Sequence, residues 1–391
     1  MLSLGENQFI KSIMRFRKIT KKFFIKFSLF PEEDNMNRTK IDSLQTLRGI
    51  AFLGIFLHHC GFGSAGSWGV SIFFVLSGFL MTYNYLPDGA FLPEIGFKKC
   101  AVFAKNKISK LYKLHLIALI CCFLLGILLK KQYLLNIIAL LLDVLLVQSW
   151  IPNADIYFSL NGVSWYLSDY LFLSFMFLPI LYILSGLRRK DAVAKKFFCL
   201  LFGIIGIEGL VAVSAYLLSR TYCANMDDIQ HWLTYIFPLS RLLDFTAGCI
   251  VGVLYTDYYK DVQIKHLNMI EFLAVMLTVI CYLINNYEIK PLGARCFRYS
   301  FVYIISSCLL VFCVAKENGF FTKRLIKIRC LNYIGDISGQ AFLIHQVVIK
   351  IVSEIFKLTN LENVWGHAYL NALVSFAITL FLVQVLKRRK D

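Results

Sequence analysis

The sequence has little charge and none of the motifs that mark many soluble enzymes. Asp, Glu, Lys and Arg make up 17% of the 391 residues, and hydrophobic residues make up 58%. Soluble domains average about 25% charged and about 45–50% apolar residues. The chain has no Walker A loop, no G-x-G-x-x-G after a strand, and no H-E-x-x-H, C-x-x-C or G-x-S-x-G sequence. ATP hydrolysis, dinucleotide chemistry and zinc catalysis are therefore not expected, and we expect no metal.

The twelve cysteines and the net charge of +17 also lack the patterns of a disulfide scaffold or a nucleic-acid-binding protein. Most of the cysteines lie inside apolar runs and are interpreted as small hydrophobic side chains. The basic residues cluster in loops and tails, where a membrane protein keeps its positive-inside signal. Nucleic acid is therefore not an expected partner.

What the sequence does contain is a series of apolar segments of about 20 residues, long enough to span a bilayer as helices. They predict an all-α, polytopic membrane bundle, because helices satisfy their own backbone hydrogen bonds in lipid. Residues 1–40 carry nine Lys and Arg and show no cleavable signal peptide; we expect a basic cytoplasmic arm on anionic lipid. Residues 41–391 are predicted to form one transmembrane domain. The eleven apolar segments are 44–62, 67–86, 111–129, 133–151, 164–184, 197–219, 236–255, 268–286, 297–315, 338–356 and 368–386.

Loop charge suggests that one of these segments does not cross the membrane. The basic stretches at 98–113 and 188–196 both belong inside by the positive-inside rule, yet three apolar segments separate them. We therefore predict about ten full transmembrane helices and one re-entrant segment, 133–151, which carries Asp143 and Gln148. An uncovered Asp in hydrocarbon is costly, so a re-entrant path suits it. Both termini are then cytoplasmic, and the plasma membrane is the expected location.

The segment 46–60, TLRGIAFLGIFLHHC, places an arginine and two histidines on one apolar helix. Each helical residue advances about 100° and about 1.5 Å, so Arg48 and His59 lie on one face, about 16.5 Å apart. His58 falls about 80° off that line and is the less favoured of the two histidines. Ionisable groups within spans are functional candidates, because each is costly unless it is paired or wetted. The alternatives are a snorkelling Arg48 and a histidine that only bonds a neighbouring helix.

Four further sites have both a functional and a structural interpretation. Arg241 and Asp244 have the i,i+3 spacing of an ion pair that either binds a ligand or holds the bundle together. Trp165 is interpreted either as an interface anchor or, with Asp169, as part of a site. His345 is either a packed, hydrogen-bonded side chain or a site residue, and we expect it two turns into its span from the inner side. The basic run is either positive-inside charge or a phosphate clamp, and it comprises Lys105, Lys107, Lys110 and Lys113.

Together these motifs resemble the membrane-bound acyltransferase 3 family over most of residues 41–386. The most specific part is IDSLQTLRGIAFLGIFLHHC followed by WGVSIFFVLSGFL, in which Arg48 and His59 fall on the family's Arg-x10-His pair. The stretches GVSWYLSDYLFLSFMFLP, PLSRLLDFTAGCIVG and YIGDISGQAFLIH match further blocks in the family's order.

The chain departs from the family at two places. Where the family has Arg-x-x-Arg followed by Pro, this sequence has Lys107-x-x-Lys110, with Lys113 in place of the proline. Lysine keeps the charge but loses bidentate phosphate recognition. Where the family often has Trp-x-Leu-x-x-Glu, Asp169 comes one position early and Tyr170 takes the place of the acid.

The resemblance implies an O-acyltransferase that moves an acyl group, most often acetyl from acetyl-CoA, to a hydroxyl of an extracytoplasmic carbohydrate or cell-envelope glycan. His59 would act as the base or as a transient acyl carrier, since histidine is the usual base near pH 7. Arg48 would steer the CoA from the cytosolic side. The residues expected to bind the cofactor are Lys107, Lys110, Ser77 and Gly78.

On the acceptor side the resemblance implies a carbohydrate and, as further partners, membrane lipid and glycan-assembly proteins. The residues expected to bind the acceptor are Trp165, Asp169, Arg241, Asp244 and His345. The alternative function is a carbohydrate-lipid flippase or exporter, because intramembrane Arg, Asp and His also mark transport paths. The paired inverted repeats of many transporters are not seen in this sequence.

Overall fold

The structure, a computed structural model, describes residues 38–86, 95–129, 137–188, 193–221, 226–286, 299–364 and 366–388. Within these ranges all regular structure is helical and no strand occurs, which confirms the predicted fold class. Residues 1–37 of the predicted N-terminal arm lie outside the described ranges. The helices are α2 (Asp42–His59), α3 (Gly66–Tyr85), α4 (Phe97–Leu128), α5 (Ile137–Leu145), η2 (Gln148–Trp150), α6 (Ala154–Tyr157), α7 (Trp165–Leu187), α8 (Val193–Thr221), α9 (Met226–His231), η3 (Trp232–Ile236), α10 (Pro238–Leu254), η4 (Tyr255–Tyr259), α11 (Leu267–Asn286), α12 (Ser300–Ala315), α13 (Phe320–Leu325), α14 (Arg329–Leu358), η7 (Leu361–Asn363) and α15 (His367–Arg388).

Seven helices of the described ranges are long and apolar enough to cross a membrane. They comprise α3, α4, α7, α8, the α9–η4 stretch that contains α10, α11 and α15. Helix α12 is apolar but has 16 residues, and α14 has 30 residues with polar positions along its length. Helix α2 has 18 residues and includes Asp42 and Arg48. The protein therefore has the helices of a multi-pass membrane protein, whereas the predicted count of about ten crossings is not confirmed.

Two segments can be compared in detail with the sequence prediction. The basic stretch 98–113, expected as a loop, forms the first half of α4, so its lysines project from a helix. Within segment 133–151, α5 has nine residues and rises about 13.5 Å, too little to cross a hydrocarbon core of about 30 Å. Asp143 on α5 is buried and accepts hydrogen bonds from Ser159 (2.9 Å) and Ser164 (2.8 Å). The re-entrant path of the whole segment stays a prediction.

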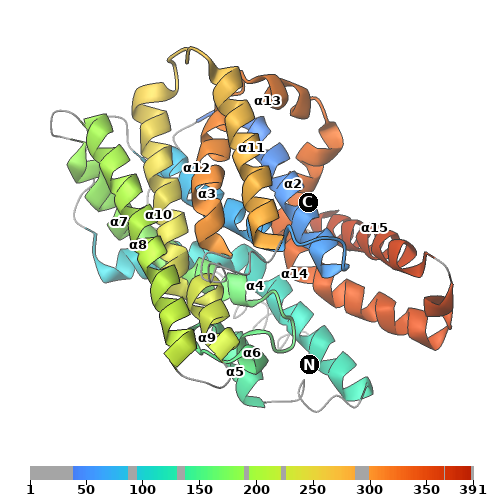
Figure 1. Cartoon of the computed structure of the whole chain (residues 1–391). Coiled ribbons are helices and arrows are strands. Elements are labelled where there is room, and N and C mark those ends of the chain that lie inside the picture. Colours follow the sequence, from blue (N-terminus) through green and yellow to red (C-terminus); the bar gives the residue numbers. More distant parts are fainter. Residues whose placement is uncertain are drawn as a thin grey trace, which may run out of the picture. The chain divides into compact units, whose positions relative to one another are not determined.

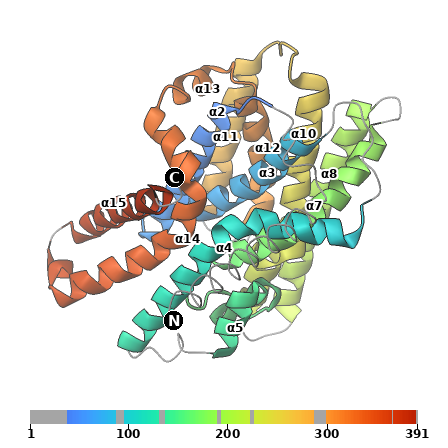
Figure 2. The same ribbon diagram turned by 180° about the vertical axis from the view of Figure 1, so that it is seen from behind.

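Glycines set two of the closest helix contacts in the bundle. A Cβ on Gly335 of α14 would lie 1.8 Å from the Gln45 carbonyl oxygen of α2, and one on Gly49 would lie 2.2 Å from the Leu331 oxygen. Helices α3 and α10 meet in the same way: a Cβ on Gly78 would lie 2.0 Å from the Phe245 carbonyl oxygen. Small residues allow close backbone approach where lipid removes the hydrophobic drive for helix association. These contacts hold α2 against α14 and α3 against α10, and Figures 1 and 2 show both pairs.

Polar contacts gather several helix ends at one end of the bundle, which we call the basic end. Arg188, after α7, pairs with Asp257 of η4 through bonds of 2.6 and 2.8 Å. The Lys316 Nζ, after α12, donates to carbonyls that include that of Val262 (2.9 Å). Lys40, before α2, pairs with Asp336 of α14 at 2.9 Å. The loop from α2 to α3 lies at the opposite end, the cavity end, where a cavity of about 690 Å³ is found.

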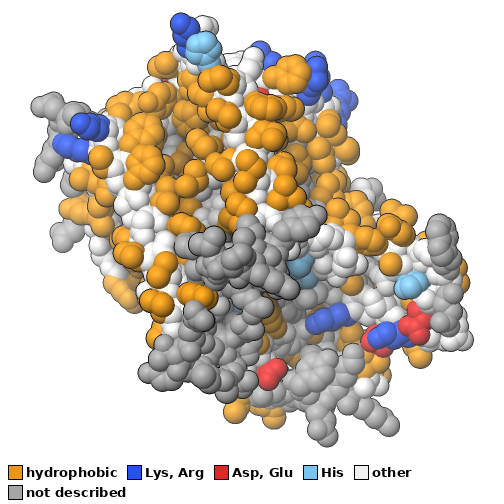
Figure 3. Space-filling model, viewed as in Figure 1, with side chains coloured by type: hydrophobic (Ala, Val, Ile, Leu, Met, Phe, Trp, Pro, Cys, Tyr) orange, Lys and Arg blue, Asp and Glu red, His pale blue; other side chains and the backbone are white. Residues whose placement is uncertain are grey.

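The outer helices expose apolar side chains over broad areas. The most exposed include Leu128 (78%) on α4 and Leu210 (68%) on α8. Figure 3 shows hydrophobic side chains in orange across one face of the molecule, with several blue Lys and Arg side chains at the end where α10, α11 and α13 meet. A contiguous apolar surface of this extent marks contact with a partner or a membrane, and lipid is the partner that the helix lengths fit.

Candidate active site

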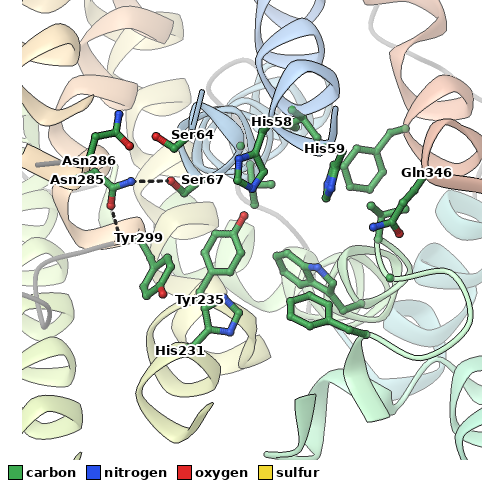
Figure 4. A pocket seen from close by; sticks show the side chains of 18 of the residues that line it. His58, His59, Ser64, Ser67, His231, Tyr235, Asn285, Asn286, Tyr299 and Gln346 are labelled. Carbon is green, nitrogen blue, oxygen red and sulfur yellow. Dashed lines mark hydrogen bonds between the residues drawn. The ribbon is translucent and has the colours of Figure 1, made fainter. Parts of the chain in front are cut away.

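A cavity of about 690 Å³ opens among α2, α3, α7, η3, α11 and α14 at the cavity end. His58 and His59 enter it from α2, as Figure 4 shows, with Gln346 of α14 beside them. The turn after α2 is made by Gly61 and Gly63, both at positive φ, which glycine adopts readily. It brings Gly66 so close to His58 that a Cβ there would lie 2.5 Å from the imidazole ring.

His59 and His345 form the centre of the site. Their ring centroids lie 5.2 Å apart, and His59 is half-buried and lines the cavity, while His345 is fully buried. The His345 Nδ1 lies 2.7 Å from the Phe342 carbonyl oxygen, so this nitrogen donates when it carries the proton. The Nε2 has no hydrogen-bond partner among the described residues. His345 is thus packed and hydrogen-bonded, as the structural interpretation expected, yet it also contacts the candidate base.

The depth of His345 and the position of His58 differ from the predictions. Helix α14 begins at Arg329, nine residues before the predicted span, so His345 lies about four turns into the helix, at the level of His59. His58 also lines the cavity, and its Nδ1 lies 3.1 Å from the Gly63 carbonyl oxygen. The chain turns back directly after α2, and this turn brings the cavity wall to His58.

A second, smaller space lies near the basic end. It has a volume of about 170 Å³ and is lined by Arg48, Lys107 and Ser77, with no carboxylate among its lining residues. The Lys107 Nζ donates a 2.8 Å hydrogen bond to the Tyr85 hydroxyl and lies 4.5 Å from the centre of that ring. Two cations and no carboxylate among its described lining residues give this pocket a positive character, which suits an anion. We call it the anion pocket.

A narrow pocket of about 90 Å³ lies between the two spaces. It shares Arg48, Phe73, Ser77 and Tyr170 with the anion pocket, and it shares Phe342 with the large cavity. Three adjoining spaces thus run from Arg48 to His59 alongside α2. The face shared by these two residues, predicted from helix geometry, is the face that borders the route.

The other residues predicted to bind the cofactor lie away from the route. Lys110 is exposed on α4 and lines none of the three spaces. Gly78 faces α10, where it allows close helix packing. Of this predicted set, the structure therefore brings Lys107 and Ser77 to the anion pocket together with Arg48.

Among the residues predicted to bind the acceptor, Trp165 lines the large cavity, while three others are buried. Arg241 and Asp244 are both 0% exposed and paired at 2.8 Å. The Arg241 Nη2 donates to the Thr234 carbonyl at 2.6 Å. Asp169, one helical turn after Trp165, is also buried, and its carboxylate oxygens have no hydrogen-bond partner among the described residues. For Arg241 and Asp244 this geometry favours the structural interpretation over direct acceptor contact.

Sequence reasoning did not find most of the polar residues of the cavity. They come from segments far apart in the chain. Figure 4 shows Ser67, His231, Tyr235, Asn285 and Tyr299 across the space from His59. Asn285 donates to the Ser67 hydroxyl (3.3 Å) and accepts from the Tyr299 backbone N–H (3.2 Å). Helix η3 is a π-helix, a type often found at functional sites. The polar residues missed are Ser64, Ser67, His231, Tyr235, Asn285, Asn286, Tyr299, Gln346 and Lys350.

No group of three or more His, Cys, Asp or Glu side chains in the described ranges is placed to hold a metal ion. The chemistry that the arrangement does offer is that of a histidine in a polar, aromatic cavity and an anion pocket at the other end of the same helix.

Comparison with known proteins gives a family match over nearly the whole described chain. A family model for an acyltransferase domain matches residues 41–387. "Acyltransferase MdmB" of Streptomyces mycarofaciens is 24% identical over 336 residues, which cover 80% of this chain and 79% of that protein. "Putative peptidoglycan O-acetyltransferase YrhL" of Bacillus subtilis (strain 168) is 25% identical over 358 residues, which cover 86% of this chain and 52% of that protein. No solved structure matches the chain.

Proposed function

The chain belongs to this acyltransferase family, and from that premise we propose that it moves an acyl group, acetyl in the first instance, from cytosolic acyl-CoA to a hydroxyl of an extracytoplasmic carbohydrate. One observation carries the proposal: helix α2 places Arg48 in an anion pocket at one end and His59 in a large cavity at the other, with adjoining spaces between them. Donor and acceptor then approach from opposite ends of one helix.

The anion pocket is the proposed donor site. CoA carries phosphates, and Arg48 and Lys107 supply positive charge where no acid competes. A guanidinium matches phosphate geometry with two donors, while the lysine acts as a point charge. The thioester arm is then directed through the narrow pocket toward His59. The basic end, which carries the charge expected inside a membrane, faces the cytosol in this proposal, and both termini are cytoplasmic in the plasma membrane.

The large cavity is the proposed acceptor site. Its amides, hydroxyls and aromatic rings suit a sugar, because a few placed polar groups orient a ligand while aromatic surfaces cover it. His59 takes the proton from the acceptor hydroxyl, and that oxygen forms a bond to the acyl carbon. The carbon–sulfur bond then breaks with its electron pair on sulfur, and the proton passes from His59 to the CoA thiolate. The oxygen ester and free CoA are the products.

His345 and the buried polar residues have supporting roles in this scheme. His345 packs against the His59 ring and holds it toward the cavity. Arg241 lies with its guanidinium 5.7 Å from the centres of the Phe74 and Tyr235 rings, and Tyr235 lines the cavity. Arg241 and Asp244 thus position part of the acceptor wall. We propose no direct contact between this ion pair and the acceptor.

The family match favours acyl transfer over the alternative of a flippase or exporter. A discriminating measurement is the heat stability of the purified protein with and without acetyl-CoA. We expect acetyl-CoA to raise the melting temperature, because a ligand that binds only the folded state stabilises it. The melting temperature of a carbohydrate-lipid transporter is not expected to change when acetyl-CoA is added.

Complementation in cells tests the proposed chemistry. Cells that lack this chain receive the wild type, His59→Ala, or the matched control His266→Ala, whose histidine is exposed near the basic end. Surface glycans are then analysed by mass spectrometry for acyl groups. We expect the wild type and the control to restore the acyl mark, and His59→Ala to lower it by about 10²–10⁴-fold, the contribution of a positioned base. A folded His59→Ala protein that restores full acylation would refute the proposal.

A further inference from the structure

Three aromatic side chains separate the narrow pocket from the cavity that holds His59. The ring centroids of Phe73 and Phe342 lie 6.0 Å apart, those of Phe342 and Tyr166 5.1 Å, and those of Phe73 and Tyr166 6.2 Å. Each pair is edge-on or tilted, so the three rings form a closed triangle of contacts. All three line the narrow pocket, and Phe342 lines the cavity on its other side as well. We call them the aromatic trio.

The pocket in front of the trio is small and mixed in character. Its volume is about 90 Å³, and a buried water needs about 10–15 Å³ on the same measure. It therefore has room for about six to nine water-sized groups. The carbonyl carbon, oxygen and sulfur of a thioester occupy the space of three water-sized groups. The remaining space holds only a short acyl chain. Leu111, Leu167 and Leu343 supply apolar walls for that chain, while Arg48 stands at the donor side.

Helix α14 borders the narrow pocket and the large cavity through residues spaced three or four apart, which lie on one helix face. Gly339 and Phe342 line the narrow pocket, and Phe342, Gln346 and Lys350 line the cavity. At Gly339 an added Cβ would meet only the Leu111 Cδ2, at 3.7 Å, which is an ordinary van der Waals distance. A larger side chain at this position thus fits the helix packing but enters the pocket.

We propose that the aromatic trio, with Gly339 beside it, selects the acyl group by size and admits only short chains to His59. This inference rests on the proposed function, in which the donor arrives from the Arg48 side. The acyl group is the leading end of the thioester arm, so it meets the trio before any other part of the donor does. Acetyl and butyryl groups fit the pocket and pass, whereas an octanoyl group is held back with its carbonyl carbon short of the acceptor hydroxyl. The bonds made and broken in the transfer are those of the proposed reaction.

Two substitutions on α14 change the passage in opposite directions. Phe342→Ala removes one ring of the trio but keeps the backbone carbonyl that accepts from His345. Gly339→Val fills part of the pocket with two methyl groups. The matched control is Phe356→Ala, because Phe356 lies on the same helix, is 6% exposed against 5% for Phe342, and lines none of the three spaces.

The experiment measures the dissociation constants of acetyl-CoA, butyryl-CoA and octanoyl-CoA for the purified full-length protein in detergent by competition binding. One methylene in an apolar pocket changes discrimination by about 10-fold or more. In the wild type and in Phe356→Ala, octanoyl-CoA should bind at least about 10-fold more weakly than acetyl-CoA. Phe342→Ala should lower the ratio of the octanoyl-CoA dissociation constant to the acetyl-CoA dissociation constant by about 10-fold. Gly339→Val should raise the ratio of the butyryl-CoA dissociation constant to the acetyl-CoA dissociation constant.

The outcomes separate this inference from the proposed function. If the wild type binds no acyl-CoA, the proposed function fails and the inference fails with it. If it binds acetyl-CoA but binds octanoyl-CoA equally well, or if both variants keep the wild-type ratios, the size filter alone is refuted. Should Phe342→Ala not fold, Gly339→Val still decides the question, since it narrows the pocket without removing a core ring.

Discussion

The buried pair of Arg241 and Asp244 gives a prediction about stability that can be worked out from the structure. Both side chains are 0% exposed, and the pair is 2.8 Å apart within one turn of α10. Arg241→Met leaves the carboxylate of Asp244 buried without its cation, and breaking such a pair costs about 3–5 kcal/mol. The melting temperature of the purified protein should then fall by several degrees.

The double substitution Arg241→Met with Asp244→Leu serves as the matched comparison. Replacing a whole buried pair by apolar residues is often neutral or stabilising, so the double variant should recover most of the melting temperature that Arg241→Met loses. Both variants lose the guanidinium that lies 5.7 Å from the centre of the Tyr235 ring. Acyl transfer to the acceptor should therefore be less efficient in both. The reasoning is refuted if Arg241→Met melts at the wild-type temperature and yet abolishes acyl transfer, since this would make the pair a direct binding site.

Three further outcomes are expected. Glu271→Ala should cost about 1–3 kcal/mol and expose α13 to protease, because the Glu271 carboxylate accepts the backbone N–H groups at the start of that helix (2.8 and 2.9 Å); unchanged proteolysis would contradict this. Lys107→Met should weaken acetyl-CoA binding about 10-fold and reduce its salt dependence, as measured by titration at two salt concentrations, whereas an unchanged salt dependence would remove Lys107 from the donor site. Lys40→Ala should change the free energy of unfolding by less than about 1 kcal/mol, since its pair with Asp336 is exposed. The hydrogen bond that the Lys40 ammonium donates to the Asp336 carboxylate raises the Lys40 pKa above 10.5, so the small contribution is present below pH 10.5 and is lost as the pH rises beyond it.

The sequence was sufficient for those features that depend on local pattern. Apolar segment length predicted the helical membrane class, and helix periodicity placed Arg48 and His59 on the face that borders the route between the two pockets. The order of the motifs identified the family, which the comparison confirmed. Each of these depends on residues close together in the chain or on an ordered set of short motifs.

Features that depend on tertiary contacts could not be predicted in this way. The level of His345 beside His59 depends on where α14 begins and on how it packs against α2 through Gly49 and Gly335. Tyr235 and Tyr299 line the cavity because η3 and the start of α12 meet there. The sequence pattern of neither segment predicts this contact. Charge alone predicted a binding role for Lys110 and Lys107 equally. Only the fold shows that Lys107 is the one of the two that lines the pocket.

The most direct test of the central claim is the sidedness of acyl transfer. Sealed membrane vesicles of known orientation are given isotopically labelled acetyl-CoA on one side only, and the label on glycan at the opposite face is measured by mass spectrometry. Transfer is expected when the donor is supplied at the face that carries the basic end, and no transfer is expected from the other face or with His59→Ala. Equal labelling from the cavity face of intact vesicles, or undiminished labelling with folded His59→Ala, would contradict the account.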